Sequence, residues 1–224
     1  MENPVADLHI HSHYSHDSLL SPRTILRKAK AECLSCIAIT DHGTIRGGIE
    51  ARKIAPAYGI EVIVGMEIRT DCGDITGLGL DKEIHETAWA SVNAAIKDQN
   101  GIVILPHPFR DHSNVEQIAL TVDLIECWNA RSTPEQNSLA ADLAQRFRMP
   151  VLLGSDAHVA SEIGSVKMRI DRSTLECREI LCSRYSTASE IHHSQIISLV
   201  KQRRWGTLIS QGTAYLKRNL TKNR

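Results

Sequence analysis

Short clusters of histidine and carboxylate residues stand at the ends of apolar runs, and their spread along the chain constrains the fold more than any other feature. They lie at residues 7–11, 40–42, 65–67, 106–108 and 154–158. Imidazole and carboxylate groups together suit borderline to hard divalent cations such as zinc, manganese or iron. A fold that lets these segments form one polynuclear metal site must bring distant parts of the chain to the same place.

Two of the clusters have the spacing of a β-strand. Side chains two residues apart on a strand point to the same face and lie roughly 6.5–7 Å apart. His9 and His11 therefore face together, and Asp156 and His158 repeat this spacing. Because several cations held close together are suited to hydrolysing phosphate esters, the pattern predicts a hydrolase.

The composition narrows the class of protein without naming a partner. A chain of 224 residues is long enough for one domain with a substantial core. Lys plus Arg and Asp plus Glu both number 26, so no overall charge recruits nucleic acid or an acidic membrane. The first motif begins at Asp7 and no apolar run approaches the roughly 18 residues of a membrane span, so we expect a cytoplasmic protein without a membrane partner.

Runs typical of strands alternate with runs typical of helices up to about residue 153. The expected strands are 5–11, 36–40, 61–64, 74–80, 102–105, 123–128 and 151–153, and the expected helices are 21–32, 45–58, 85–97, 115–120 and 134–147. Repeated strand–helix–strand units predict parallel strands with crossover helices. Nearly every cluster follows a strand, and the carboxyl ends of the strands converge on one face of a closed barrel. An open sheet would scatter the clusters, so we expect a barrel.

Taken together, the clusters resemble those of the PHP family, named for polymerase and histidinol phosphatase. The segments that carry the resemblance are Asp7-Leu-His-Ile-His-Ser12, Ile39-Thr-Asp-His42, Gly65-Met-Glu67, Pro106-His-Pro108 and Gly154-Ser-Asp-Ala-His158. The resemblance covers about residues 5–165. It implies an α/β fold, a single-domain, distorted (β/α)7 TIM-like barrel, with two to three divalent ions (zinc, manganese or iron) at the strand ends and phosphoesterase activity.

The resemblance also implies a set of metal ligands. His9, His11 and Asp156 would bind one metal, Glu67 would bridge it to a second metal held by His107, and Asp17, His42 and His158 would bind a third. A bridging carboxylate keeps two cations roughly 3.5–4 Å apart, which lets them share a nucleophile. Glu67 is therefore the residue expected to tolerate change least.

Two ligand positions stay open. In the first loop the family often has Ser-Asp-Gly, whereas this chain has Ser15-His16-Asp17-Ser18, so either His16 or Asp17 could be the ligand, and we favour Asp17. The second metal needs a further ligand near the end of the predicted strand 123–128, where Cys127 and Asn129 are the candidates. A thiolate binds borderline metals well, although a cysteine at a strand end also packs well in a core.

Two arginines follow motif strands and are candidates for binding a substrate phosphate. The forked guanidinium groups of Arg110 and Arg131 could each hold a phosphate through two hydrogen bonds. The expected reaction is in-line attack of a metal-held hydroxide on phosphorus, with Glu67, Asp156 and His158 among the catalytic residues. Small phosphomonoesters, particularly nucleotides, are the favoured substrates. The alternatives are a phosphodiesterase or exonuclease acting on nucleic acid, and a non-catalytic PHP-type binding module.

The end of the chain is the one region with a local charge imbalance. After Glu190 it has no acidic residue but carries Lys201, Arg203, Arg204, Lys217, Arg218, Lys222 and Arg224. Such a tail either attracts nucleic acid or forms a solvated helix, and we favour the solvated helix. We expect a barrel over residues 1–190 and a basic helical extension over 191–224, packed on or part of the same domain.

Overall fold

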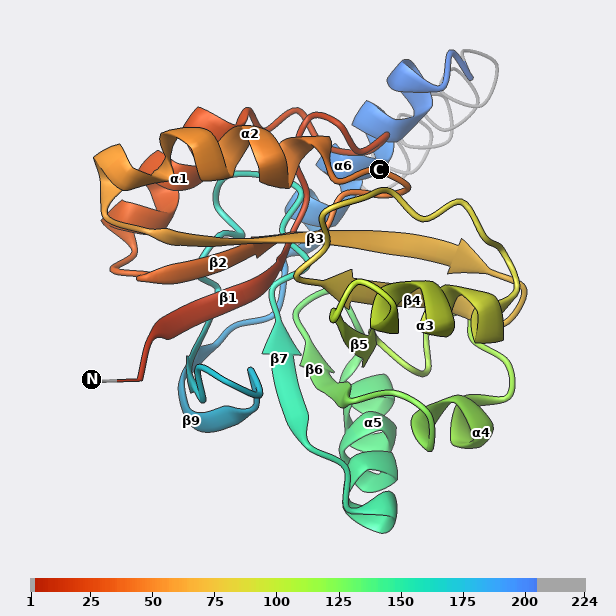
Figure 1. Ribbon diagram of the computed structural model, residues 1–224. Helices are drawn as coiled ribbons and strands as arrows, with labels where there is room; N and C mark the ends of the chain where they lie inside the picture. Colours follow the sequence, from red (N-terminus) through yellow and green to blue (C-terminus); the bar gives the residue numbers. More distant parts are fainter. Residues whose placement is uncertain (1–2, 205–224) are drawn as a thin grey trace, which may run out of the picture.

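One nine-stranded sheet organises the protein, whose computed structural model describes residues 3–204. The strands lie in the order β7-β6-β5-β4-β3-β2-β1-β8-β9. They are β1 (Val5–Ile10), β2 (Cys36–Ile39), β3 (Glu61–Thr70), β4 (Gly73–Leu78), β5 (Ile102–Leu105), β6 (Leu124–Asn129), β7 (Val151–Gly154), β8 (Val166–Ile170) and β9 (Cys177–Ser183). Figure 1 shows β1 and β7 side by side, which brings β7, at one end of this series, against β1 near the other end.

Main-chain hydrogen bonds join β1 to the segment that follows β7. The Ala157 N–H donates to His9 O at 3.2 Å, and the His11 N–H donates to Ala157 O at 2.9 Å. The sheet is therefore a nearly closed barrel, which confirms the barrel-like α/β fold expected from the sequence.

One strand runs against the expected parallel order. β1, β2 and β3 are parallel, as are β5, β6 and β7, but β4 pairs antiparallel with both β3 and β5. Only Asp71 and Cys72 connect β3 to β4, and a two-residue connection can join only antiparallel strands. β3 also extends to Thr70, six residues beyond the predicted end, so Glu67 lies within a strand.

The hairpin of β8 and β9 was not expected from the sequence. β8 pairs antiparallel with β1, and β9 forms the outer edge of the sheet. β8 alternates buried Val166, Met168 and Ile170 with half-buried Lys167 and Arg169, and β9 is largely exposed. The alternation in β8 is the pattern of a half-buried strand, which the sequence analysis overlooked.

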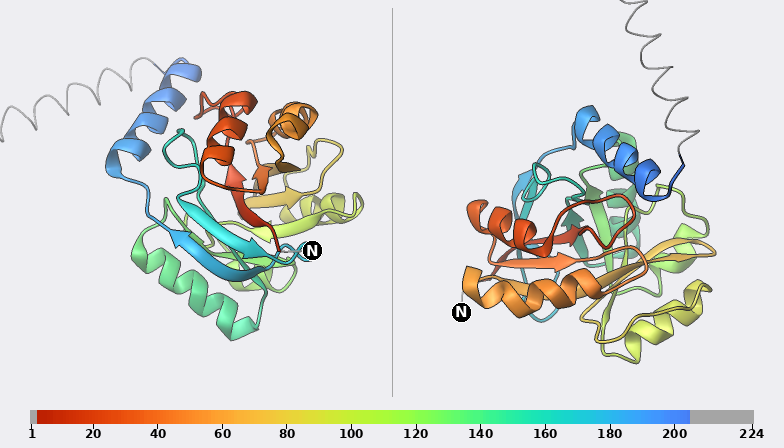
Figure 2. Two further views of the ribbon diagram at one scale, coloured as in Figure 1. Left: turned by 90° about the vertical axis from the view of Figure 1, so that its left-hand side faces the viewer. Right: turned by 90° about the horizontal axis from the view of Figure 1, so that it is seen from above.

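Helices cover the outside of the barrel, as the two views of Figure 2 show. They are α1 (Pro22–Ala31), α2 (Arg46–Ile54), the short 3-10 helix η1 (Ala55–Tyr58), α3 (Trp89–Lys97), α4 (Val115–Ala119), α5 (Pro134–Phe147) and α6 (Ala188–Lys201). The α1 helix begins where the Ser21 hydroxyl accepts the Thr24 N–H, and α5 begins with a capping box at Thr133. α3 starts at Trp89, four residues after the predicted start. None of the described helices is long and apolar enough to cross a membrane.

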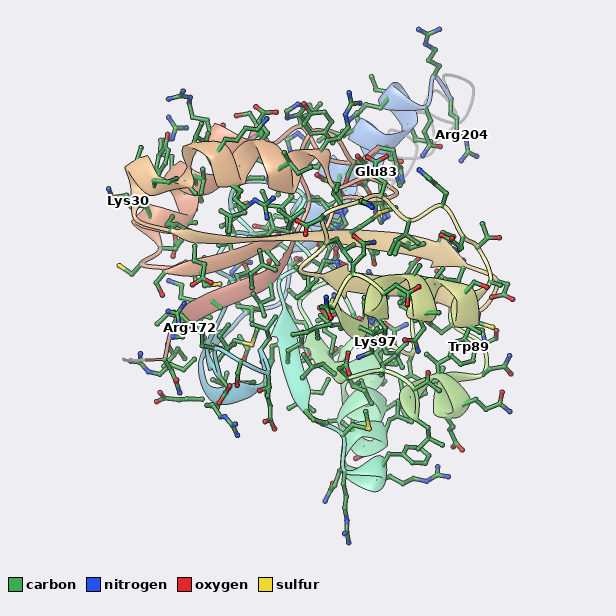
Figure 3. The ribbon with its side chains drawn as sticks, viewed as in Figure 1. Lys30, Glu83, Trp89, Lys97, Arg172 and Arg204 are labelled. Atoms are coloured by element: carbon green, nitrogen blue, oxygen red, sulfur yellow. The ribbon has the colours of Figure 1, made fainter. Side chains whose placement is uncertain are left out.

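Charged side chains divide into a peripheral set and a central set. Figure 3 shows Lys30, Arg172 and Arg204 at the periphery of the molecule, where all three are exposed to solvent. The histidines and carboxylates of the motifs are instead mostly buried among the strand ends. Burying so many ionisable groups is costly unless they pair or bind metals, so the central set marks a functional site.

Candidate metal centre

The motif residues lie close together at the ends of the strands. His9 lies on β1 and His11 directly after it, Glu67 lies on β3, His107 follows β5, and Asp156 follows β7. Groups of these side chains have potential ligand atoms within 4.8 Å of one another: His11, Asp17, His42 and His158; His9, His11 and Glu67; His9, His107 and Asp156; Glu67, Asp74 and His107. The structure therefore brings together eight of the nine predicted metal ligands.

The carboxylate of Glu67 lies at the centre of the cluster. Its Oε1 atom is 2.9 Å from His107 Nε2. Its Oε2 atom is 3.2 Å from His42 Nδ1, 3.4 Å from His11 Nε2 and 3.6 Å from His9 Nε2. One carboxylate thus faces four imidazoles with both oxygens, which is the geometry expected of a group that bridges metal ions.

Backbone strain accompanies two of the candidate ligands. The φ angles of His107 and Asp156 are +30° and +52°. Residues other than glycine rarely adopt positive φ, and such strain of order 1–3 kcal/mol concentrates at functional sites. Each residue stands just after a strand ends, so the turn redirects its side chain toward Glu67 and His9.

Glu126 orients His9 and was missed by the sequence analysis. The Glu126 side chain, 1% exposed, has Oε1 at 2.9 Å from His9 Nδ1, while Oε2 accepts the His107 N–H at 2.8 Å. A carboxylate on Nδ1 directs the other nitrogen, Nε2, toward the cluster. A Cβ atom at Gly154 would lie 1.7 Å from Glu126 Oε1, so only glycine there leaves space for this contact.

Asp17 joins the cluster from the loop after β1. Its Oδ2 atom lies 3.0 Å from His158 Nε2 and 3.3 Å from His42 Nε2. His16 is more exposed, with 45% of its side chain accessible, and its Nε2 atom is 3.7 Å from the same oxygen. The His16 ring lies 4.7 Å from that of His42, but of the two residues left open in this loop only Asp17 belongs to a group of potential ligand atoms within 4.8 Å of one another.

The two alternatives on β6 occupy different surroundings. Cys127 packs against α5, in a hollow lined by Ala144 and Met149, and burial raises the pKa of its thiol to about 12. The structure does not bring Cys127 to the cluster, because side chains alternate along β6 and Glu126 takes the inward position. Asn129 does reach the cluster, but its Nδ2 donates to Glu126 Oε2 at 2.9 Å, so the amide supports the carboxylates.

Asp74 is a candidate for the further ligand of the second metal, the role for which the sequence offered Cys127 and Asn129. Its carboxylate groups with Glu67 and His107, within the 4.8 Å limit. The residue lies on β4, whose antiparallel course beside β3 places Asp74 opposite Arg69. A lone aspartate in an extended run carries no recognisable ligand spacing, so only the hairpin reveals it.

The donor atoms of the cluster fit divalent metal ions. Among residues 3–204, the buried atoms His9 Nε2, His11 Nε2, His107 Nδ1 and Asp17 Oδ1 have no hydrogen-bond partner. Buried polar atoms are normally paired, and His9 Nε2 and His11 Nε2 face the carboxylates of Glu67 and Asp156 at distances of 3.3 to 3.6 Å. Such donor sets suit zinc, manganese or iron, so the residues present match the metals that the sequence implies.

Burial and neighbouring charges shift the pKa values of the ionisable groups in the cluster. Burial alone would raise the pKa values of Glu67 and Asp156, but nearby positive groups, His42 and His9 for Glu67 and Arg110 and His9 for Asp156, hold both pKa values well below the usual range. Burial lowers the pKa of His11 to about 3, assisted by His158 and His42. The centre therefore offers ionised carboxylates beside a neutral His11 imidazole. Despite burial, the same carboxylates raise the pKa of His9 well above its usual range and that of His42 to about 9, and a metal bound there would have to displace those protons.

The two candidate arginines differ in their partners. The Arg110 Nη2 atom donates to Asp156 Oδ2 at 2.6 Å, and 29% of its side chain is exposed. Arg131 donates through Nε to Glu162 Oε1 at 2.9 Å and through Nη2 to Ser194 Oγ at 2.7 Å. Arg110 therefore touches the cluster directly, whereas Arg131 joins the barrel to α6.

The fold and the site define a barrel with a cluster of potential metal-binding side chains at its strand ends. A sequence model of the PHP domain matches residues 7–210. The chain belongs to the PHP family.

Known relatives cover different shares of the chain. An uncharacterised protein of Methanocaldococcus jannaschii is 30% identical over 183 residues, which are 76% of this chain and 72% of that protein. A 5'-3' exoribonuclease of Haemophilus influenzae is 37% identical over 44% of this chain and 37% of its own length. A 3',5'-nucleoside bisphosphate phosphatase of Chromobacterium violaceum is 37% identical over 34% of this chain and 27% of its own length.

Solved structures share the fold at low sequence identity. A two-domain protein from Bacteroides vulgatus, which contains a PHP-like metal-dependent phosphoesterase, superposes with a TM-score of 0.66 at 18% identity over 86% of this chain and 69% of that one. An amidohydrolase from Chromobacterium violaceum with bound sulfate superposes with a TM-score of 0.63 at 18% identity, over 80% of this chain and 93% of that one.

Proposed function

We propose that this protein hydrolyses small phosphomonoesters, nucleotides in particular, with two to three divalent ions of zinc, manganese or iron. The observation that carries the proposal is the Glu67 carboxylate, which faces four imidazoles at the strand ends. In this proposal His9, His11, Asp17, His42, Glu67, Asp74, His107, Asp156 and His158 hold the metals. Bound divalent ions would supply charge stabilisation of the phosphoryl oxygens and a nucleophilic water at neutral pH.

Arg110 is the protein group best placed to bind the phosphate. Its guanidinium reaches Asp156 with one nitrogen, Nη2, and Asn129 Oδ1 with another, Nη1, at 3.4 Å. The part of the side chain that is exposed can turn its remaining donors to a phosphoryl group. Arginine binds a terminal phosphate bidentately and so favours a monoester, whose phosphate presents three unesterified oxygens.

A cavity of about 380 Å³ beside Asp17 is the space for the leaving group. Arg131, Ser194 and Gln195 contribute polar atoms to it, and Ile191 and Leu199 contribute apolar ones. Because Glu162 neutralises the charge of Arg131, the cavity suits a neutral group with polar and apolar faces, such as a nucleoside. Arg131 would therefore contact the leaving group, and Arg110 the phosphate.

A second candidate is cleavage of nucleic acid from one end. It is favoured by the likeness to an exoribonuclease, which covers 44% of this chain. The likeness to a nucleoside bisphosphate phosphatase covers 34% and favours the small substrate. The non-catalytic module is opposed by the completeness of the donor set, because a degenerate scaffold would be free to lose ligands.

The test compares a panel of nucleoside monophosphates and sugar phosphates with a single-stranded oligonucleotide, using protein loaded in turn with zinc, manganese or iron. We expect turnover of monophosphates to dominate.

Arg110→Ala should raise KM for a monophosphate roughly 10- to 100-fold, since a charge-assisted hydrogen bond contributes about 1.5–3 kcal/mol. Arg146→Ala on α5, which removes an exposed pair with Glu116 on α4, is the control. Oligonucleotide cleavage without monophosphate turnover would decide for the nuclease, and turnover of neither with any of the three metals would favour the module.

A further inference from the structure

The loop between β1 and α1 carries Asp17 but contains little regular structure. Its base is fixed by Ser18, whose hydroxyl contacts His11 O and His158 O, both at 2.9 Å. Its interior is held by a Ser15 hydroxyl that donates to Asp41 Oδ1 at 2.8 Å. Asp17 itself stands at the far side of the loop, where residues from the end of α6 approach it.

Lys201, the last residue of α6, contacts this loop through its ammonium group. The Nζ atom donates to three main-chain carbonyl oxygens: His13 O at 2.7 Å, Ser18 O at 3.1 Å, and Ser15 O. A lysine ammonium has three protons to donate, so the three carbonyls use its full capacity. These acceptors span the turn that contains His16 and Asp17, so one cation ties both sides of that turn together.

α6 is anchored at its other end by polar contacts rather than by a broad apolar face. Glu190 accepts from Ser161 Oγ at 2.6 Å and from Arg184 Nη1 at 3.1 Å, and it completes the capping box with Thr187. Arg131 reaches Ser194 in the next turn of the helix at 2.7 Å. α6 therefore bridges the barrel and the loop, with Lys201 at its C-terminal end.

We propose that Lys201 is a positioning residue that holds Asp17 against His42 and His158. The metal that these three residues would hold, called the outer metal below, then binds only when α6 is docked. The inference rests on the proposed function for the role of Asp17 as a ligand. Lys201 contacts main-chain carbonyls and no metal-binding side chain. It acts on the shape of the loop, and its loss would leave the donors on β1, β3 and β5 in place.

Lys201→Met tests this proposal in the full-length, metal-loaded protein, because methionine keeps the length of the side chain and removes its donors. We expect the protein to lose about one metal equivalent per chain after equilibration in a metal buffer, and the affinity of the outer metal to fall at least about 10-fold, as for other residues that support metal ligands. The remaining metal and the unfolding temperature of chelator-treated protein should match the wild type. Lys28→Met, which removes a surface pair with Glu32, is the control.

Chemical rescue separates hydrogen bonding from charge. In Lys201→Ala, propylammonium should restore the lost metal because it supplies three N–H donors to the carbonyls. Tetramethylammonium, which has the same charge and no N–H, should not restore it. Lys201→Arg should keep part of the metal affinity.

Unchanged metal content and affinity in Lys201→Met would overturn the proposal. Equal rescue by both cations would also overturn it. So would a loss of metal that is fully explained by the fraction of protein that is unfolded. Metal analysis does not depend on a substrate, so these results stand apart from the outcome of the substrate panel. A protein that lacks phosphatase activity but loses metal in Lys201→Met would refute the proposed function and retain the role of Lys201.

Discussion

The inner and outer halves of the metal cluster are built differently. His9, Glu67, His107 and Asp156 form the inner half, lie on strands or directly after them, and are 1–3% exposed. In the outer half, Asp17 and His42 lie in loops, and 16% and 29% of their side chains are exposed. His11 belongs to groups in both halves, and His158 Nδ1 lies 3.5 Å from Asp156 Oδ1.

The two halves also differ in what holds their side chains in place. Inner residues take their positions from the hydrogen bonds of the sheet and from Glu126, itself 1% exposed. The outer Asp17 takes its position from a loop that depends on Lys201, a residue far away in sequence. A strand cannot shift one residue without disturbing its neighbours, whereas a loop can. We expect the inner metals to be held tightly and the outer metal to exchange.

Replacing Glu67 should have the largest effect, because this residue faces both halves. Glu67→Gln keeps the shape of the side chain but turns one acceptor oxygen into a donor directed at imidazole nitrogens. We expect phosphoesterase turnover to fall at least about 100-fold and the metal content to fall in both halves, as measured by steady-state kinetics and elemental analysis. His85→Ala, at an exposed residue away from the cluster, is the control. Wild-type turnover in Glu67→Gln would show that another carboxylate bridges the metals.

Replacing Asp17 should weaken metal binding in the outer half of the cluster and spare the inner half. Asp17→Asn weakens one ligand of the outer group and leaves His9, Glu67 and His107 unchanged. We expect the loss of about one metal equivalent, with turnover reduced roughly 10- to 100-fold, and an anomalous-scattering map should retain the inner peaks. Loss of every metal would show that the cluster binds its ions as one cooperative unit, and that the division into halves is wrong.

The smallest predicted effect concerns the anchor of α6. Burial opposes ionisation of Glu190, but Arg184, Ser161 and the main chain of Thr187 lower its pKa from 4.5 to about 2. A carboxyl group with a lowered pKa stabilises the fold above its unfolded value, so this contribution is present above about pH 4.5 and is lost as the pH falls toward 2.

Glu190→Gln should therefore lower the free energy of unfolding slightly at neutral pH and match the wild type near pH 2. Denaturant unfolding across this pH range measures the difference between the two proteins. A destabilisation that is equally large near pH 2 would mean that shape, rather than charge, anchors the helix. If α6 supports the outer half, Glu190→Gln should also weaken the outer metal at neutral pH and spare the inner ones.

Much of the inner half was predictable from the sequence. The strands of His9, His107 and Asp156 were located to within about one residue, because short apolar runs bounded by turns have a clear period. The sequence predicted the β4 strand but not its antiparallel direction, since the residues of an extended run do not reveal how the run pairs with its neighbours. The ligand role that we propose for Asp74 depends on that direction, and so does its closeness to Glu67.

Residues that support the ligands were harder to predict than the ligands. Glu126 has no spacing that ties it to His9, which lies 117 residues away in the sequence. Lys201 was visible only as part of a basic tail, most of which, from residue 205 onward, lies outside the described residues. Its contacts with carbonyl oxygens carry no sequence signal, because every residue has a carbonyl group.

The sequence by itself determined the family, the barrel and the kinds of candidate ligand, because strand periodicity and the chemistry of histidine and carboxylate are local properties of a chain. The tertiary structure decided which of these side chains meet. It put Asp17 rather than His16 opposite His42 and His158, turned Cys127 away from the cluster, and brought Asp74 and Glu126 into it. These outcomes depend on strand direction, on the alternation of side chains and on contacts between distant segments, which exist only once the barrel has closed.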